Sequence, residues 1–170
     1  PLPPGEPKAA LAAGIGMVHQ HFTLADHLSV LDNVMLGTEP LWWPLSRRAA
    51  ARDKLVQTGQ RFGLGVDPDA RIADLSVGER QRVEILKALV RGARILILDE
   101  ATSAVDPETE RALAIALSKL AEGRTTVSIA HRLSTAEAAD LVVVFDAGQI
   151  VQIGHHDELV ALGGVYGRLY

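Results

Sequence analysis

The chain contains no cysteine, which excludes disulfide bonds and metal sites built on thiolate ligands. It also lacks a hydrophobic run of the roughly 20 residues that a helix needs to cross a bilayer, because its longest apolar runs are as short as residues 141–145. Several prolines occupy the start in place of the basic and apolar residues of a secretory signal. We therefore expect a soluble chain, in which any membrane role requires a partner protein.

The remaining composition is that of a globular protein. A length of 170 residues with 48% hydrophobic residues is enough for one domain with a real core. The formal net charge of -4 argues against broad nucleic-acid binding, which usually needs a basic surface. The sequence begins with Pro1 and not with methionine, so we expect a fragment of a longer chain.

Hydrophobic patterning predicts two different halves. The first half has one short strand and then only helices, at residues 14–19, 29–36, 46–61 and 76–91. The second half alternates strands with helices, at residues 95–98, 107–121, 125–130, 134–138, 141–145, 149–153 and 156–162. This alternation predicts an α/β fold with a mostly parallel sheet, whose apolar strands are buried on both faces. The helical part, about residues 23–91, is inserted after the first strand.

Two adjacent carboxylates, Asp99 and Glu100, follow the apolar strand at 95–98. The carboxyl end of a buried parallel strand is where α/β sheets bind ligands. One carboxylate can hold Mg²⁺, directly or through water, and the next can polarise an attacking water. The alternative is a strand that is followed by an acidic loop without a function.

The segment Ser76-Val77-Gly78-Glu79 has two possible roles. Ser76 and Glu79 form the pattern of a capping box, which is a structural device at a helix start. The same helix start offers free N–H groups and a positive dipole end to a phosphate, and Gly78 lets the backbone approach closely. The spacing to Asp99 and the polar residues 80–82 favour the phosphate role.

Three further polar residues are candidates. Gln20 follows the first strand and can ligate Mg²⁺ through its amide oxygen, although an exposed loop glutamine is the simpler interpretation. His131 ends the strand at 125–130 and can contact a γ-phosphate, although a satisfied strand-end histidine is the alternative. Asp106 precedes Pro107, where a helix cap explains it without any further role.

In this order the motifs resemble those of the nucleotide-binding subunit of ABC transporters, across nearly the whole chain. The resemblance implies a partial P-loop NTPase-like parallel sheet with an inserted α-helical subdomain. It divides the chain into residues 1–22 with the Q-loop, 23–91 with the helical subdomain and signature helix, and 92–170 with the ATPase core. It also implies ATP and Mg²⁺ as ligands.

The resemblance also gives each candidate a role. It implies Gln20 in the Q-loop and at the metal, Ser76, Val77, Gly78 and Glu79 as the nucleotide-binding signature, Asp99 as the Walker B metal ligand, Glu100 as the catalytic carboxylate, Asp106 in the D-loop and His131 as the switch histidine. In that family, two subunits sandwich two ATP molecules and dock on transmembrane permease subunits at the cytoplasmic face of the membrane. We therefore expect a second ATPase subunit and permease subunits as partners, a peripheral location at that face, and no nucleic acid.

One motif of that family is absent from the printed sequence. No G-x-x-x-x-G-K-[ST] phosphate loop occurs in it, and none of its lysines follows a glycine. In the family this loop precedes the Q-loop strand, so it would lie before Pro1. Because the loop supplies N–H groups and a lysine to the phosphates, we expect this chain alone to hydrolyse ATP poorly or not at all.

The two halves resemble different branches of the family. Residues 14–94 resemble importers of sugars and nucleosides, whereas residues 101–135 resemble exporters that fuse this domain to membrane helices. The join lies within 94–100, and a chimera or a natural hybrid branch would explain it. We favour import of a sugar or nucleoside. An exporter-type ATPase domain and a truncated or chimeric fragment without turnover are the alternatives.

Overall fold

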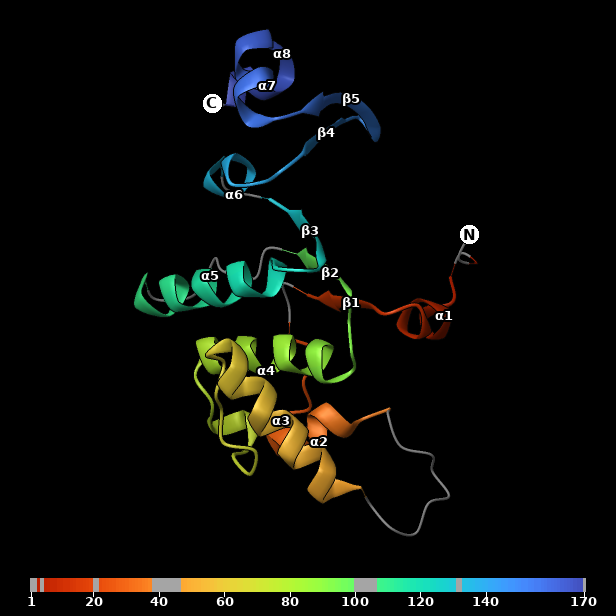
Figure 1. Ribbon diagram of the computed structural model, residues 1–170, viewed down its shortest axis with the longest axis vertical. Coiled ribbons are helices and arrows are strands. Elements are labelled where there is room, and N and C mark those ends of the chain that lie inside the picture. Colours follow the sequence, from red (N-terminus) through yellow and green to blue (C-terminus); the bar gives the residue numbers. More distant parts are fainter. Residues whose placement is uncertain are drawn as a thin grey trace. The chain divides into compact units, whose positions relative to one another are not determined.

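The computed structural model describes residues 3, 5–19, 22–37, 47–99, 107–130 and 133–169 (Figure 1), with the backbone alone at 107–110, 112 and 113. Two compact units divide the chain, residues 1–127 and 128–170. Each unit has a hydrophobic core of its own.

The first unit is built on a parallel sheet with the strand order β1-β2-β3 (Figure 1). β1 (Ile15–Val18) pairs in parallel with β2 (Ile95–Asp99), and Val18 lies opposite Leu98. β3 (Thr125–Ile129) begins beside the start of β2, where the N–H of Thr125 donates to the carbonyl oxygen of Arg94 at 3.3 Å. The three strands therefore run in one direction, which confirms the predicted α/β fold.

The predicted helical insertion lies between β1 and β2. It consists of α2 (Val30–Met35), α3 (Arg48–Phe62), the short 3-10 helix η1 (Ile72–Asp74) and α4 (Val77–Val90). Ser29 caps α2, since its hydroxyl oxygen accepts from the N–H of Asp32 at 3.1 Å. Gly63, with a φ of 69°, ends α3 in the left-handed conformation that glycine adopts without strain. The expected start of α3 at Ser46 lies outside the described residues. α5 (Pro107–Ala121) spans the predicted range and leads from β2 to β3.

The core of the first unit is centred on α4. This helix packs against α2, α3, α5 and β1. The largest fully buried side chains of the unit come from these elements and the connections beside them, and they are Val18, Val30, Leu31, Val34, Leu55, Leu64, Ile72, Ile85, Leu86, Leu96 and Leu120. Because one helix touches both the inserted part and the sheet, α4 ties the two parts of the unit together.

The expectation that the strands are buried on both faces is wrong. In β1, Val18 is buried but Met17 is 41% exposed, and every residue of β3 is exposed. The inserted helices pack around α4 and bury their apolar faces against it. Within the part of the chain that the structure describes, they leave β3 uncovered.

Two short helices lie where the sequence pattern predicts none. α1 (Pro7–Ala12) begins with a proline, which the first turn of a helix tolerates because its N–H groups have no intrahelical partner. α8 (Gly164–Leu169) follows two consecutive glycines with positive φ. Proline and glycine signal turns and breaks, so the sequence pattern hides both helices.

The second unit is a hairpin covered by helices. β4 (Val142–Asp146) and β5 (Gln149–Gly154) pair antiparallel, and Ala147 and Gly148 between them both have a positive φ, as the tightest hairpin turns require. This confirms the two strands predicted at 141–145 and 149–153. α7 (His156–Leu162) and α8 pack on the hairpin, and α6 (Leu133–Glu137) precedes it. The core consists of Val144, Leu159 and Tyr166.

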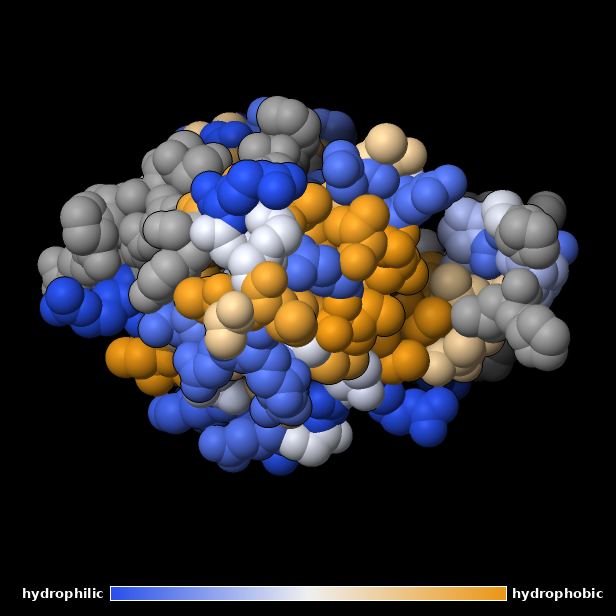
Figure 2. Space-filling model, turned by 90° about the horizontal axis from the view of Figure 1, so that it is seen from above, coloured by the Kyte–Doolittle hydropathy of each residue, from blue (hydrophilic) through white to orange (hydrophobic). Residues whose placement is uncertain are grey.

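Large hydrophobic side chains also reach the surface. In the hairpin, Phe145 is 64% exposed and Ile153 is 57% exposed. Figure 2 shows hydrophobic residues gathered into a continuous area on the face that it presents. Among the described residues, no helix combines the length and the apolar character that crossing a membrane requires.

Candidate functional site

The candidate site lies at the carboxyl ends of β1 and β2, and the resemblance adds the residue that follows β3 in the sequence. Val18 lies opposite Leu98, so the chain leaves β1 beside Asp99, the last residue of β2. The expected site residues that follow these strand ends in sequence are Gln20, Glu100 and His131. These three lie outside the described residues, as does Asp106, and their roles remain predictions. The direction and order of the strands are nevertheless those that such a site needs.

Asp99 is the candidate metal ligand that the structure describes. Its residue is partly buried at the end of β2, a strand anchored by Leu96, which is fully buried. No cluster of three or more histidine, aspartate or glutamate residues suited to a metal occurs among the described residues. Mg²⁺ fits this donor set, because it usually takes one or two carboxylates and completes its shell with substrate phosphates and water.

The predicted capping box is present at the start of α4. The N–H and the hydroxyl of Ser76 donate to Oε2 of Glu79 at 2.9 and 2.7 Å, and the N–H of Glu79 approaches the Ser76 hydroxyl oxygen at 3.4 Å. The Ser76 hydroxyl, followed by its N–H, lowers the pKa of the Glu79 carboxyl below its ordinary value. The structural reading of this motif is therefore confirmed, and the box holds the helix start in a defined shape.

The capping box leaves donors for an anion. The first intrahelical N–H of α4 is that of Arg80, which donates to the Ser76 carbonyl oxygen at 3.0 Å. Val77 and Gly78 precede it, and their N–H groups belong to the set that a helix leaves without partners of its own. Val77 is 42% exposed whereas Gly78 is buried, so a ligand reaches this helix start at Val77. No hydrogen bond between described residues joins this segment to Asp99. Along the chain, the two are separated by α4, which is about 21 Å long.

Arg80 organises the loop before the signature segment, and the sequence argument gave it no such role. Its Nε and Nη2 donate to the carbonyl oxygens of Leu75 and Ala73 at 3.2 and 3.1 Å, and its Nη1 lies 3.3 Å from a carboxylate oxygen of Asp26. The guanidinium thus ties η1 and the chain before α2 to the start of α4. Its place directly after the capping box was the only signal available.

Two polar side chains buried in α4 were also missed. Gln81 is 2% exposed and Glu84 is 3% exposed, and Oε1 of Gln81 has no hydrogen-bond partner among the described residues. Glu84 accepts two hydrogen bonds from Thr23, which follows Gln20 by three positions in the sequence. Sequence periodicity gives no signal for such residues, because charged residues in a helix usually face water.

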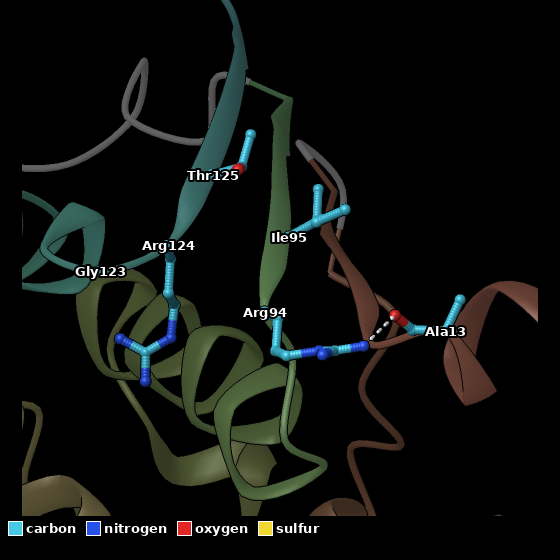
Figure 3. A pocket seen from close by; sticks show the side chains of 6 residues that line it. All are labelled: Ala13, Arg94, Ile95, Gly123, Arg124 and Thr125. Carbon is cyan, nitrogen blue, oxygen red and sulfur yellow. Dashed lines mark hydrogen bonds between the residues drawn. The ribbon is translucent and has the colours of Figure 1, made fainter.

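The opposite edge of the sheet offers no comparable site. A cavity of about 530 Å³ there is lined by Arg94, Arg124 and four neighbours (Figure 3). The two arginine side chains point away from each other in Figure 3 and bind backbone carbonyl oxygens, Arg94 that of Ala13 at 3.4 Å and Arg124 that of Leu120 at 3.1 Å. Arg124 also lies over the ring of Phe62. These arginines therefore support the fold and do not converge on an anion.

Known proteins match this chain along most of its length. Residues 4–103 match the family described as "ABC transporter". The chain is 42% identical over 147 residues to the nucleoside import ATP-binding protein NupA of Lactococcus lactis, covering 85% of the chain and 29% of that protein. It is 44% identical over 163 residues to the β-(1→2)glucan export ATP-binding/permease protein NdvA of Rhodopseudomonas palustris, covering 95% and 27%. It is 52% identical over 122 residues to the ATP-dependent lipid A-core flippase of Pseudomonas syringae, covering 72% and 20%.

A solved structure supports the same relationship. The chain superimposes on a bacterial Atm1-family ABC exporter with ATP bound, with a TM-score of 0.73, 32% identity, and coverage of 92% of this chain and 28% of that one. The fold is therefore that of a P-loop NTPase-like ATP-binding domain. The chain belongs to the ABC transporter family. It spans about 20–30% of the length of these relatives, which are named for import as well as for export.

Proposed function

We propose that this chain is part of an ATP-hydrolysing subunit that drives a solute across a membrane. The observation that carries the proposal is the parallel alignment of β1 and β2, which directs the chain after Val18 and the carboxylate of Asp99 to one edge of the sheet. In this proposal Glu100 orients a water for in-line attack on the γ-phosphate of ATP, and His131 contacts that phosphate. Asp99 and Gln20 hold Mg²⁺, which neutralises charge on the phosphates when bound.

The start of α4 contributes to a second nucleotide site. Val77 and Gly78 offer N–H groups at the positive end of a 14-residue helix. The length of α4, which separates this helix start from Asp99 along the chain, supports a site completed by a second ATPase subunit. We propose this head-to-tail pair, docked on permease subunits at the cytoplasmic face of the membrane, as the working assembly.

The test is ATP hydrolysis by the whole protein with its membrane subunits in liposomes. Glu100→Gln is expected to lower kcat by at least about 100-fold while ATP still binds, because the water loses its base. Glu122→Gln, at an exposed position after α5, is the matched control and is expected to leave kcat unchanged. Equal hydrolysis by wild type and Glu100→Gln contradicts the proposed mechanism.

The 170-residue chain alone is the second test, because its sequence contains no phosphate loop. We expect no phosphate release that depends on Glu100. ATPase activity of the purified chain that disappears in Glu100→Gln contradicts this expectation. A chain that binds no ATP and aggregates supports the alternative, a fragment without turnover.

The direction of transport is a separate question. We favour import of a nucleoside or sugar, because residues 14–94 resemble importers and NupA is named for nucleoside import. Export is the alternative, favoured by the 95% coverage against NdvA. With ATP supplied outside the liposomes, labelled nucleoside that moves from the lumen toward the ATP side indicates import. Accumulation of a labelled glucan or lipid in the lumen indicates export.

A further inference from the structure

The chain that follows Gln20 is attached to the signature helix by two side chains of α4. Glu84 Oε1 accepts from the N–H of Thr23 at 2.5 Å and from its hydroxyl at 2.8 Å. The ammonium of Lys87 donates to the hydroxyl oxygen of Thr23 at 3.0 Å and approaches its carbonyl oxygen at 3.5 Å. All the polar atoms of Thr23 are thus held by one helix. We call Thr23, Glu84 and Lys87 the Thr23 clamp.

The charged group at the centre of the clamp, the Glu84 carboxylate, is buried. Glu84 is 3% exposed, and its Oε2 lies 3.6 Å from the ammonium of Lys87, whose side chain is 17% exposed. A buried carboxylate is unfavourable unless hydrogen bonds and an opposite charge compensate it. An apolar side chain would fill the place of Glu84 in the core without the free-energy cost of burying a charge. Packing alone therefore does not explain why a carboxylate lies there.

The position of the clamp connects two parts of the proposed ATPase site. Thr23 follows Gln20 by three residues, and it lines one cavity together with His19, Glu84 and Lys87. The clamp thus lies beside the chain that leaves β1. At its other end, α4 begins with the capping box of Ser76. Because an α-helix of 14 residues moves as a rigid element, Thr23 follows any displacement of the signature segment.

We propose that Glu84 is a positioning residue, which fixes the chain after Gln20 to the signature helix so that both parts of the nucleotide site move together. The inference rests on the proposed function, in which Gln20 and the signature segment bind the same class of ligand. Glu84 itself touches neither ATP nor metal. Its removal should therefore impair turnover more than ATP binding.

The experiment uses the whole protein and measures two quantities. Hydrogen–deuterium exchange reports the attachment directly, since Glu84 is the acceptor for the N–H of Thr23. In Glu84→Ala, the amide of Thr23 is expected to exchange at least about tenfold faster, while those in the middle of α4 keep their protection. The kcat of ATP hydrolysis is expected to fall about 10- to 100-fold with an ATP KM within about twofold of wild type.

Two further variants separate positioning from folding. Glu84→Gln keeps an oxygen acceptor for Thr23, so it is expected to restore slow exchange at Thr23 and most of the kcat. Thr23→Val removes one hydroxyl from an exposed residue and keeps the backbone bond, so it decides the question if Glu84→Ala does not fold. It is expected to lower kcat about threefold. Glu122→Ala, at an exposed position, is the matched control for loss of a carboxylate.

Each outcome decides one point. Unchanged exchange of the Thr23 amide in Glu84→Ala overturns the clamp. Faster exchange with an unchanged kcat, or a Thr23→Val variant with wild-type kcat, overturns the positioning role. If the wild-type protein hydrolyses no ATP, the proposed function fails, whereas the exchange result still decides whether the clamp exists.

Discussion

The side chain of Asn33 forms two hydrogen bonds with the backbone of Ala25. The N–H of Ala25 donates to Oδ1 of Asn33 at 2.7 Å, and Nδ2 of Asn33 donates to the Ala25 carbonyl oxygen at 3.1 Å. The same Nδ2 also donates to the carbonyl oxygen of Ser29 at 2.9 Å, and Asn33 is fully buried in α2. One amide side chain thus replaces the hydrogen bonds that a neighbouring strand would give to Ala25.

Replacing Asn33 should therefore destabilise the first unit strongly. We expect Asn33→Ala to lower the free energy of unfolding by about 1–3 kcal/mol, because it leaves the N–H of Ala25 without its partner and removes buried atoms. The carbonyl oxygens of Ala25 and Ser29 each lose one of two hydrogen bonds. Urea unfolding followed by circular dichroism measures this loss. Asp53→Ala, on the exposed side of α3, is the control and is expected to change stability by less than about 0.5 kcal/mol. A loss at Asn33 no greater than that of the control contradicts the role assigned to it.

Gly16 allows β1 to approach α4 closely. A methyl group added at Gly16 would lie 2.9 Å from Cβ of Ala93 and 3.1 Å from Cβ of Ala88. We expect Gly16→Ala to destabilise by about 1–3 kcal/mol, because these small side chains cannot move aside as a long one would. Gly65 is the matched control, since a methyl group there would meet nothing within 4 Å. Thermal melts of the two variants should differ clearly, and equal melting temperatures would show that β1 can shift away without cost.

Local patterns predicted most of the elements. The capping box at Ser76, the helix at about 29–36 and the helix that begins at Pro107 were all predicted, and the structure confirms them. Each depends on residues within one turn of one another, so sequence spacing carries the information. The parallel sheet was predicted from the alternation of strands and helices. This alternation limits how consecutive strands can be connected, but it does not specify which side chains are in contact.

The buried polar contacts were not predictable in this way. Asn33 and Glu84 join chain segments 8 and 61 residues apart, and no periodicity marks a partner at such separations. The expectation that β3 is buried was wrong for a related reason. An apolar run shows that a strand can be buried, but it does not show which helices cover that strand. At the candidate site, the sequence predicted Asp99 at a strand end and a capped helix that begins at Ser76. The hydrogen bonds between Thr23 and Glu84 could be found only in the folded structure.

Glu79 gives the capping box a pH dependence. The hydroxyl and N–H of Ser76 lower the pKa of the Glu79 carboxyl below its ordinary value of 4.5, so the ionised form stabilises the fold. This contribution is present at neutral pH and is lost as the pH falls below about 4.5 through the lowered pKa. We expect Glu79→Gln to be less stable than wild type by about 0.5–1 kcal/mol at neutral pH and equally stable at about pH 3.

Urea unfolding of wild type and Glu79→Gln at the two pH values measures this gap. Glu122→Gln, at an exposed position, is the control for a general effect of removing one carboxylate and should show no comparable gap at either pH. A gap that stays the same at acidic and neutral pH would mean that the ionised carboxyl of Glu79 contributes nothing to the helix start.

Substitutions of Arg80 and Asp26 test which contacts hold the loop at residues 71–76. The ion pair is weak because the Asp26 side chain is 66% exposed, so Asp26→Asn is expected to cost less than about 0.5 kcal/mol. The Arg80 side chain is 24% exposed, and its bond to the carbonyl oxygen of Leu75 is partly buried, so we expect the bonds to the backbone to contribute more than the ion pair. Arg80→Lys keeps the charge but cannot reproduce the planar fork of donors, and we expect it to cost about 1–2 kcal/mol. Hydrogen exchange at residues 71–76 should accelerate in Arg80→Lys and not in Asp26→Asn. The reverse order would show that charge, and not the geometry of the guanidinium, shapes this loop.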